Sequence, residues 1–329
     1  MKILLLGSTG LLGRNVLNKL LEKKHHVVAV VRNSHGIKDI QSKNLIIIES
    51  SLNDISHLKS TAKDCHAVIN CAGTTDMSLL HYEDYLAMNT ELCRSLISLA
   101  ETTDIKTIVH ISTANTIGFG TPGHPADESN GMREPFASSY YARSKREGEK
   151  ILEEYAHRHS DCHIVILNPG FMVGAWDAKP SSGQLLLAGY RRWIMVAPPG
   201  GKSFVAVNDV ADAAISALTE GRNGERYLIT GEELTLKDFY HRQASVMGYR
   251  QIQIKLPRWL LCIAGTLGDI LRNLKLKTQL STNNISQLAV MEYYTSDKAK
   301  KELGFSPTSL DDAIRDFFVW NKEHKKLQK

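Results

Sequence analysis

Tyr141 and Lys145 lie four residues apart in the segment Tyr-Ala-Arg-Ser-Lys, which leads into a charged helical stretch through Lys150. On a helix this spacing places a phenol and an ammonium on one face. A neighbouring ammonium favours the ionised phenol, so we expect the pKa of Tyr141 to fall from its reference value of about 10 toward working pH. Tyr141 is therefore a candidate proton donor or acceptor.

Two hydroxyl-bearing residues, Ser112-Thr113, follow the apolar run Thr107–Ile111 upstream of this pair. A hydroxyl at a strand end donates to a substrate carbonyl oxygen or caps the local backbone, and with the phenol and amine nearby we favour the first role. A second pair of the same spacing, Tyr294 and Lys298, has no hydroxyl-rich strand end at the matching distance upstream. We therefore interpret it as accidental.

A glycine-rich turn follows the apolar run Ile3–Leu6 at the start of the chain. Its spacing is G-x-x-G-x-x-G rather than the plain G-x-G-x-x-G of dinucleotide-binding proteins. A helix N-terminus offers unpaired N–H groups and partial positive charge, and glycines let phosphate oxygens approach. We predict a pyrophosphate site formed by Gly7, Thr9, Gly10, Leu11, Leu12 and Gly13.

Apolar runs without polar alternation recur along the first half of the chain, separated by segments of helical periodicity. This alternation predicts an α/β fold with a doubly wound parallel sheet of the Rossmann type, covered on both faces. Ligand sites in such sheets lie beyond the carboxyl ends of the strands. The expected strands are Ile3–Leu6, Val27–Val31, Leu45–Ile48, Ala67–Cys71, Thr107–Ile111 and Ile164–Leu167.

The strand pattern loosens after Leu167, where Asn168-Pro-Gly170 and Pro198-Pro-Gly-Gly201 punctuate shorter elements. We predict a nucleotide-binding domain over residues 1–170, to which residues 203–230 return. Ser203–Val207 and the helical run Val210–Leu218 carry this return. A smaller, interleaved C-terminal substrate lobe then comprises residues 171–202 and 231–329.

The 329 residues are 43% hydrophobic and carry a net charge of +5. Basic residues are scattered except in Lys322–Lys329, which we interpret as a solvated tail, so nucleic acid is not expected as a partner. The five cysteines show neither C-x-x-C pairs nor metal-ligand spacing. We expect reduced thiols, no metal and a cytoplasmic location, because the first apolar run is also too short for a secretion signal.

Residues Leu256–Leu274 form the most apolar segment, but charged residues and Pro257 interrupt it. The segment falls short of the uninterrupted span of about 20 apolar residues that a crossing helix needs, so we predict no transmembrane segment. We interpret it as an amphipathic helix that packs against its own lobe. A membrane-surface role and a lid over an apolar substrate are the alternatives.

Taken together, these motifs resemble the extended short-chain dehydrogenase/reductases of the NAD-dependent epimerase/dehydratase superfamily, in particular the dihydroflavonol reductase-like and 3β-hydroxysteroid dehydrogenase-like members. The resemblance spans essentially the whole chain. It is carried by Gly7–Gly13, Asn70-Cys-Ala-Gly73, Asn89, His110-Ile-Ser-Thr-Ala-Asn-Thr-Ile-Gly118, Tyr141–Lys145, Asn168-Pro-Gly-Phe171 and Tyr293–Ala299.

The resemblance implies hydride transfer at the nicotinamide, with Tyr141 as proton donor or acceptor, Lys145 holding the nicotinamide ribose and Thr113, rather than Ser112, orienting the carbonyl. Hydride chemistry comes from the cofactor. A homodimer is typical of the family. The resemblance also places further cofactor contacts at Ala72, Gly73, Pro169, Gly170 and Phe171.

The choice of nicotinamide cofactor is expected to depend on the residue after the second strand. Arg32 stands where an acidic residue would accept the ribose hydroxyls of NAD, and no carboxylate follows until Asp39. We therefore favour NADP over NAD. Leu52 is our candidate for an apolar and backbone contact to the adenine. Asn89 is open between cofactor binding and a helix cap.

The predicted function is an NADP-dependent oxidoreductase that interconverts a ketone or aldehyde and an alcohol on a fairly apolar small molecule. The alternatives are a sugar-nucleotide epimerase or dehydratase with tightly bound NAD, and a non-catalytic NADP-sensing regulator. Two further segments are open between lining the substrate mouth and ordinary turn or surface roles. They are Asp177–Gly183 and the run Arg191-Arg192-Trp193.

Overall fold

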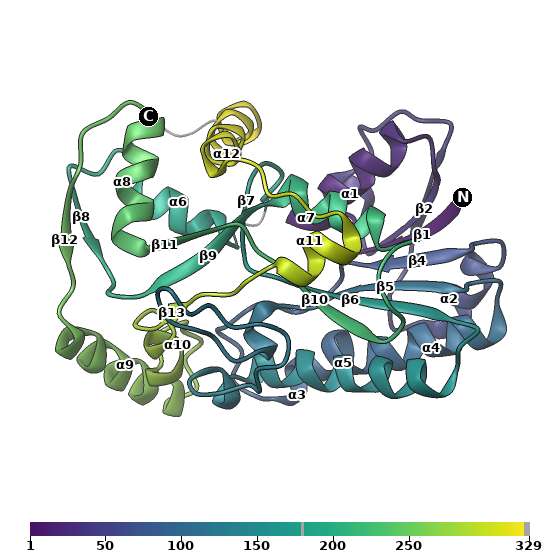
Figure 1. Ribbon diagram of the computed structural model, residues 1–329, viewed down its shortest axis with the longest axis horizontal. Coiled ribbons are helices and arrows are strands. Elements are labelled where there is room, and N and C mark those ends of the chain that lie inside the picture. Colours follow the sequence, from purple (N-terminus) through teal and green to yellow (C-terminus); the bar gives the residue numbers. More distant parts are fainter. Residues whose placement is uncertain (179–180, 326–329) are drawn as a thin grey trace.

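The protein is described here by a computed structural model covering residues 1–178 and 181–325. Within these residues a seven-stranded sheet runs through the larger part of the molecule (Figure 1). Its strands are β1 Lys2–Leu6, β2 His26–Val31, β3 Leu45–Glu49, β4 Ala67–Asn70, β5 Thr107–Ile111, β6 His163–Pro169 and β10 Glu225–Ile229. They lie in the order β10-β6-β5-β4-β1-β2-β3, and all neighbours are parallel.

Helices cover both faces of this sheet because its strands are apolar on both sides. In β1, Ile3 and Leu5 join one buried cluster, whereas Leu4 and Leu6 join the other. On the first face lie α1 Leu11–Glu22, α7 Val207–Ser216 and α11 Asp297–Leu303. The second face carries α2 Ile55–Ala62, α4 Leu92–Thr102 and α5 Tyr140–Arg158. The predicted doubly wound sheet is confirmed.

The strand order reverses between β1 and β4, which are neighbours in the sheet. At such a switch point the loops after the two strands diverge and leave room for a ligand beyond the carboxyl edge. The glycine-rich turn follows β1, and Ala72-Gly73 follow β4. The topology thus brings two predicted cofactor segments to one place. Short helical turns follow β2 at Ser34–Gly36 and β5 at Ala114–Thr116. A third short turn, Phe136–Ser138, lies just before α5.

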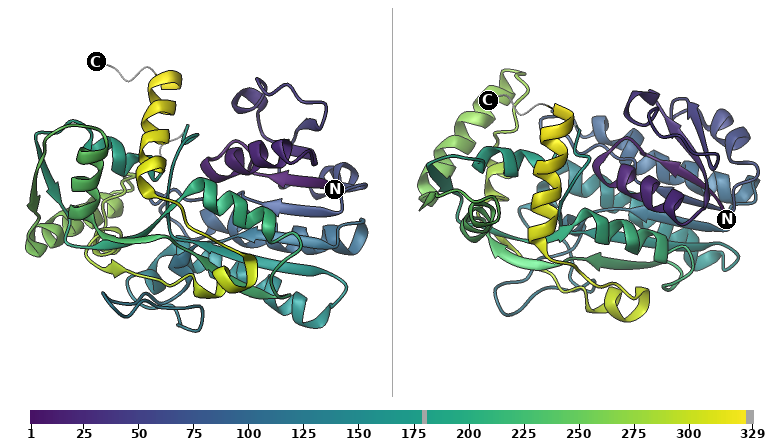
Figure 2. Two further views of the ribbon diagram at one scale, coloured as in Figure 1. Left: turned by 45° about the horizontal axis from the view of Figure 1, so that its top comes forward. Right: turned by 90° about the horizontal axis from the view of Figure 1, so that it is seen from above.

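The other end of the molecule is a smaller lobe built on a second sheet (Figure 2). In its core the rings of Phe204 and Phe239 stack 4.3 Å apart. Its strands are β7 Phe171–Val173, β9 Gly201–Ala206, β11 Glu232–Thr235 and β13 Met291–Glu292, beside the pair β8 Ile194–Ala197 and β12 Ile252–Lys255. Its helices are α6 Gly183–Gly189, α8 Leu236–Val246, α9 Arg258–Asn273, α10 Thr282–Ser286 and α12 Leu310–Lys325.

The return of the chain to the main sheet begins later than the sequence predicts. Strand β9, expected to rejoin the main sheet as Ser203–Val207, pairs with β7 and β11 in the second sheet. Helix α7 and then β10 carry the chain back, and β10 pairs with β6. The basic run expected as a tail begins inside α12 at Lys322, and residues 326–329 lie outside the described residues.

Helix α5 packs so closely on the segment before α4 that one of its positions accepts only glycine. A Cβ on Gly148 would lie 2.2 Å from the carbonyl oxygen of Asn89 and 2.8 Å from the sulfur of Cys93. Both contacts are far inside ordinary van der Waals separation, so a side chain here forces the two helices apart.

We predict that Gly148→Val lowers the free energy of unfolding by about 2 kcal/mol or more, because overpacking outweighs any gain in helix propensity. Urea denaturation measures this. Gly131→Val is the matched control, since within the described residues a Cβ on Gly131 meets nothing within 4 Å. Equal stability of the two variants would contradict the packing account.

Candidate active site

The three glycines of the turn after β1 differ in what a side chain at each position would contact. Gly7 has a φ of +80°, and a Cβ there would lie 2.6 Å from the Ala72 nitrogen. On Gly13 a Cβ would lie 2.1 Å from the Gly7 carbonyl oxygen. These two glycines are required by internal packing. At Gly10, which precedes α1 as its N-cap, a Cβ meets only one described atom, at 3.5 Å.

The packing of the described residues therefore does not require glycine at position 10. A ligand that approaches the first N–H groups of α1 would require it, because a side chain there would stand in the way. The first turn of α1 holds no acidic side chain to occupy this position. A diphosphate fits this arrangement. Thr9 is exposed beside it, whereas Leu12 is buried in the core and offers only its backbone. Leu11 is half-buried.

At the end of β2, Arg32 is exposed, and no hydrogen bond or ion pair joins it to another described residue. The carboxylates nearby are engaged elsewhere. Asp39 binds the guanidinium of Arg14 at 3.2 Å, and Arg14 also donates to the carbonyl of Gly36 at 2.9 Å. Glu49 accepts a hydrogen bond from the Ser34 N–H at 2.8 Å. Among the described residues, Arg32 is thus the charged side chain directly after this strand that has no partner.

The segments after β3 and β4 complete the predicted cofactor side. Leu52 is buried in the apolar cluster under the second face of the sheet. Ala72 is fixed by its N–H, which donates to the Asn70 side chain at 3.0 Å. A Cβ on Gly73 would lie 3.2 Å from Asn89 Oδ1 and 3.3 Å from Lys145 Nζ. The missing side chain of Gly73 leaves space where these two polar groups converge.

Tyr141 and Lys145 occupy one face of α5, at its start. Ser139 caps the helix by accepting from the Ala142 N–H. The buried ammonium of Lys145 donates to the carbonyl oxygen of Ile111, the last residue of β5, at 2.7 Å. Thr113 follows two residues later, and its hydroxyl interacts with Tyr141. The same hydroxyl accepts from the Asn115 N–H at 3.2 Å, so it also has the capping role weighed above.

The expected depression of the Tyr141 pKa is wrong for the protein without ligand. Burial raises the pKa of Tyr141 to about 12, although its hydrogen bond with Thr113 acts in the opposite direction. Burial likewise lowers the pKa of Lys145. The reason is that the Lys145 ammonium is directed at the Ile111 carbonyl, while removal from water disfavours the phenolate. Tyr141 is therefore held as a protonated donor.

The neighbouring tyrosine, Tyr140, and the second Tyr–Lys pair lie apart from this cluster. Tyr140 is exposed and packs its ring 5.7 Å from that of Tyr82. Lys298, of the second Tyr–Lys pair, binds Glu225 at 2.6 Å and the Arg226 carbonyl at 2.7 Å. Its ammonium is thereby committed to the edge strand β10.

Asn89 does not cap a helix. It lies fully buried in a π-helical turn, Ala87–Glu91, between α3 (Glu83–Leu86) and α4. Its side chain accepts from the Thr74 N–H at 2.8 Å and donates to the Thr74 carbonyl and to the Ser144 hydroxyl, each at 3.0 Å. Asn89 thus joins the loop after β4 to α5, beside Lys145. Single π turns often occur at functional sites.

Sequence reasoning missed a buried carboxylate beneath the site. Glu149, one turn beyond Lys145 on α5, accepts from the Thr116 hydroxyl and from the Asn168 amide, each at 2.7 Å. The same amide reaches the Thr113 carbonyl at 3.1 Å. Arg146 neutralises the carboxylate at 3.0 Å. The only signal in the sequence is helical spacing from Lys145, which the neighbouring glutamates of α5 obscure.

The segment after β6 has a fixed backbone. Pro169 is buried, and the Gly170 N–H donates to the Ile229 carbonyl at 3.0 Å. A Cβ on Gly170 would lie 2.4 Å from the carbonyl oxygen of Ser203, so packing explains this glycine. The ring of Phe171 stands edge-on to Phe204, 5.3 Å away. The segment leads directly from the main sheet into the smaller lobe.

Two segments considered for the substrate mouth differ in their surroundings. Asp177 is buried and accepts from the N–H groups of Ser181 and Gly183, which organises a turn and the start of α6. Residues 179–180 of that segment lie outside the described residues. Arg191, Arg192 and Trp193 are all exposed, and Trp193 has 76% of its surface in solvent. They are surface residues.

A family model for the NAD dependent epimerase/dehydratase family matches residues 3–230. The chain belongs to this family. Membership confirms the resemblance to extended short-chain dehydrogenase/reductases and the prediction of an enzyme of that class, which acts on CH–OH groups with a nicotinamide cofactor. No helix in the described part of the chain has the length and apolar character required to cross a bilayer.

The chain is similar over nearly its whole length to proteins of this class. It is 27% identical to a putative dihydroflavonol 4-reductase of Synechocystis, covering 97% of this chain and 94% of the relative. It is 25% identical to sterol demethylase protein B of Methylococcus capsulatus, covering 98% and 99%. The crystal structure of gox2253 superposes with a TM-score of 0.82 at 26% identity, covering 99% of each chain.

We predict that Tyr141 stays protonated in the ligand-free protein until about pH 12. An ultraviolet difference titration of the wild type against Tyr141→Phe measures the phenolate of this residue alone. Because the pKa is raised, no phenolate signal should appear below about pH 10, the reference value for a tyrosine in water. A signal that develops near neutral pH would show instead that Lys145 controls the ionisation.

Proposed function

We propose that this protein is an NADP-dependent oxidoreductase that interconverts a ketone or aldehyde and the corresponding alcohol on a fairly apolar small molecule. The observation that carries the proposal is the cluster of Tyr141, Thr113 and Lys145 at the carboxyl edge of the sheet, next to the glycine-rich turn. The cofactor, when bound, supplies the hydride. The protein supplies the proton, the orientation of the carbonyl and the exclusion of water.

Tyr141 and Thr113 would together receive the carbonyl oxygen of the substrate. Both are hydroxyl donors, and their mutual interaction holds them on the same side of the site. Tyr141, protonated at neutral pH, donates its proton as negative charge develops on that oxygen. Lys145 lies one helical turn away, and we assign it to the nicotinamide ribose. Asn89 positions the loop after β4 beside it.

The preference for NADP is supported by the surroundings of Arg32. An adenosine 2′-phosphate needs a cation, and Arg32 is exposed at the strand end without another described partner. NAD needs a carboxylate for its ribose hydroxyls. The first one after β2, Asp39, is bound by Arg14. We assign the adenine to the side of Leu52 and the diphosphate to Gly10 and the backbone of Leu11 and Leu12.

The apolar character of the substrate is supported by the relatives, whose names refer to a dihydroflavonol and to a sterol. Both are ring systems with few charges. We also propose the division into a cofactor domain and a substrate lobe, since the chain passes from one to the other at Gly170 and Phe171. Polycyclic ketones are therefore the first substrates to test.

We predict that Tyr141→Phe lowers NADPH-dependent reduction of such ketones by about 10²–10⁴-fold, because the proton donor is lost. The binding of NADPH, followed by its fluorescence, should change little. Tyr140→Phe is the matched control, since it removes the adjacent, exposed phenol and should retain full turnover. Unchanged turnover in Tyr141→Phe would contradict the assignment.

The same assay separates the proposal from its alternatives. NAD that copurifies with the protein, together with epimerisation of nucleotide sugars, would indicate an epimerase. Tight NADPH binding without turnover of any carbonyl compound would indicate a regulator.

We predict that Arg32→Ala weakens NADPH binding at least about tenfold, because a charge-assisted contact to the 2′-phosphate is lost. The binding of NADH should stay the same, since it carries no phosphate there. Isothermal titration with both cofactors measures the two affinities. Lys38→Ala, which removes another exposed cation nearby, is the control. Equal losses for NADPH and NADH would count against a phosphate contact.

A further inference from the structure

Helix α9 packs with its glycines and with Leu261, and it exposes most of its other large apolar side chains. A Cβ on Gly265 would lie 2.9 Å from the Thr282 Cα, and on Gly268 it would lie 2.2 Å from the Leu280 carbonyl oxygen. These glycines form the contact with the α10 segment. Trp259 and Leu267 are 62% and 57% exposed. The large apolar side chains that α9 and the following residue expose are Trp259, Leu260, Ile263, Leu267, Ile270, Leu271 and Leu274.

This arrangement reverses what packing within the lobe would produce. An amphipathic helix on a globular protein normally turns its large apolar side chains inward. In α9 the exposed residues recur at the spacing of one helical stripe, from Trp259 through Ile263 and Leu267 to Ile270. The expectation that this segment packs its apolar face against its own lobe is therefore wrong, because the close contact with α10 is made by the glycines.

The two-stranded sheet next to α9 exposes apolar side chains as well. Ile252 pairs with Ile194, and Ile254 with Val196, and all four are exposed, whereas Met195 between them packs into the lobe. Strand β12 runs into α9, and the two lie at the same end of the molecule (Figure 1). We call the exposed apolar residues of α9, β8 and β12 the end face. Exposed apolar side chains gathered at one end of a molecule indicate an interaction site.

The end face is bordered by positive charge. Residues 250–282 contain six Lys and Arg and one acidic residue, Asp269. That carboxylate accepts from the Thr282 N–H at 3.0 Å. Lys255, Lys275 and Lys277 are exposed. The surface therefore combines apolar side chains, among them the exposed Trp259, with lysines, which suits the interface of an anionic bilayer.

We propose that the end face docks the protein on the surface of an anionic lipid bilayer. The apolar stripe of α9 enters the boundary between headgroups and acyl chains, and the lysines meet the lipid phosphates. The positive charge around the end face favours an anionic bilayer over a second copy of this chain as the binding partner. A two-fold dimer through this face would bring the same positive charges together, whereas an anionic surface neutralises them.

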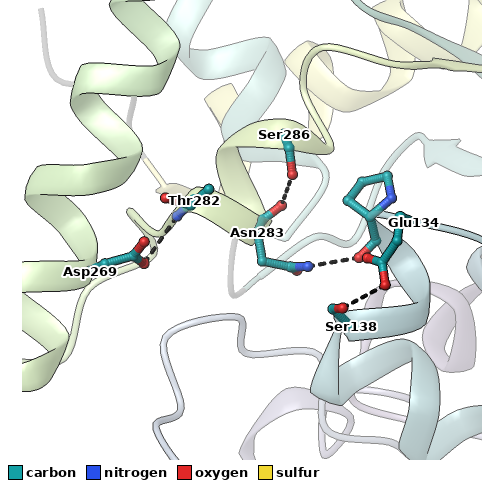
Figure 3. Close-up of a pocket in the computed structure, with 7 residues that line it drawn as sticks. Glu134, Ser138, Asp269, Thr282, Asn283 and Ser286 are labelled. Carbon is teal, nitrogen blue, oxygen red and sulfur yellow. Dashed lines mark hydrogen bonds between the residues drawn. The ribbon is translucent and has the colours of Figure 1, made fainter.

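The docked helix is tied to the rim of the candidate active site. Arg272 of α9 donates to the Leu79 carbonyl in the loop after β4 at 2.7 Å. From α10, Asn283 donates to the Pro135 carbonyl at 2.7 Å, in the segment just before α5 (Figure 3). An open depression of about 600 Å³ separates α9 and α10 from that segment. Docking thus places the opening beside Tyr141's helix close to the membrane, where apolar molecules accumulate.

The proposal is tested by cosedimentation of the full chain with vesicles of phosphatidylcholine, with and without phosphatidylglycerol. We expect binding to the anionic vesicles that weakens as salt is raised. Ile263→Gln/Leu267→Gln should weaken it at least about tenfold by removing apolar contact. Lys275→Gln/Lys277→Gln should weaken it by a similar factor. These residues are exposed, so circular dichroism and thermal unfolding should be unchanged.

The matched controls are exposed residues outside the end face. Val319→Gln replaces an exposed apolar residue on α12, and Lys23→Gln/Lys24→Gln replaces two exposed lysines after α1. Both should bind vesicles like the wild type. A wild type that stays in solution with every vesicle, or end-face variants that bind equally well, would overturn the proposal. So would a dimer in sedimentation velocity that the Ile263→Gln/Leu267→Gln variant dissociates. The readout needs no catalytic activity, so it is independent of the proposed reaction.

Discussion

The hydrogen bond from the Lys145 ammonium to the Ile111 carbonyl joins the start of α5 to the end of β5, and the candidate site depends on it. Because this buried charge is fixed, the residue one turn earlier, Tyr141, is fixed too. Thr113 is two residues past the same carbonyl, so its hydroxyl meets the phenol. A buried ammonium without an acceptor would be costly, which makes the contact an effective constraint on the helix.

The remainder of the site extends this contact along α5. Glu149 lies one turn after Lys145 on the same face of α5. It binds Thr116, which follows β5, and Asn168, which lies in β6. Asn89 binds Ser144 and the loop after β4. One helix is thereby connected to the ends of three neighbouring strands. The glycine-rich turn then adds the N-terminus of α1 from across the switch point. Each of these connections is a hydrogen bond that is buried or partly buried.

The six strands found in the sequence were predictable because each is a predominantly apolar run, as in Val27–Val31. The seventh, β10, begins with Glu225 and Arg226, since it lies at the sheet's edge, so it carries no such signal. The motif residues Tyr141 and Lys145 were predictable from helical spacing. The raised pKa of Tyr141 was not, because burial depends on packing that spacing does not reveal.

The roles of Asn89 and Glu149 likewise depend on contacts between distant segments. A π-helical turn has no sequence signature, and Glu149 is one of several glutamates on a charged helix. The orientation of α9 was predicted with the wrong face inward. The sequence is amphipathic whether the apolar face is covered or exposed. Only the tertiary contact of Gly265 and Gly268 with the α10 segment determines which face is covered.

The account is tested most directly by a crystal structure of the protein with NADP⁺ and an apolar ketone or alcohol. We expect the diphosphate over Gly10 and the reacting oxygen of the substrate within about 3 Å of the Tyr141 hydroxyl. The Lys145 ammonium should lie beside the nicotinamide ribose. A dinucleotide bound elsewhere, or a nicotinamide ring beyond reach of Tyr141, would contradict the central claim that this phenol and this amine form the reacting centre.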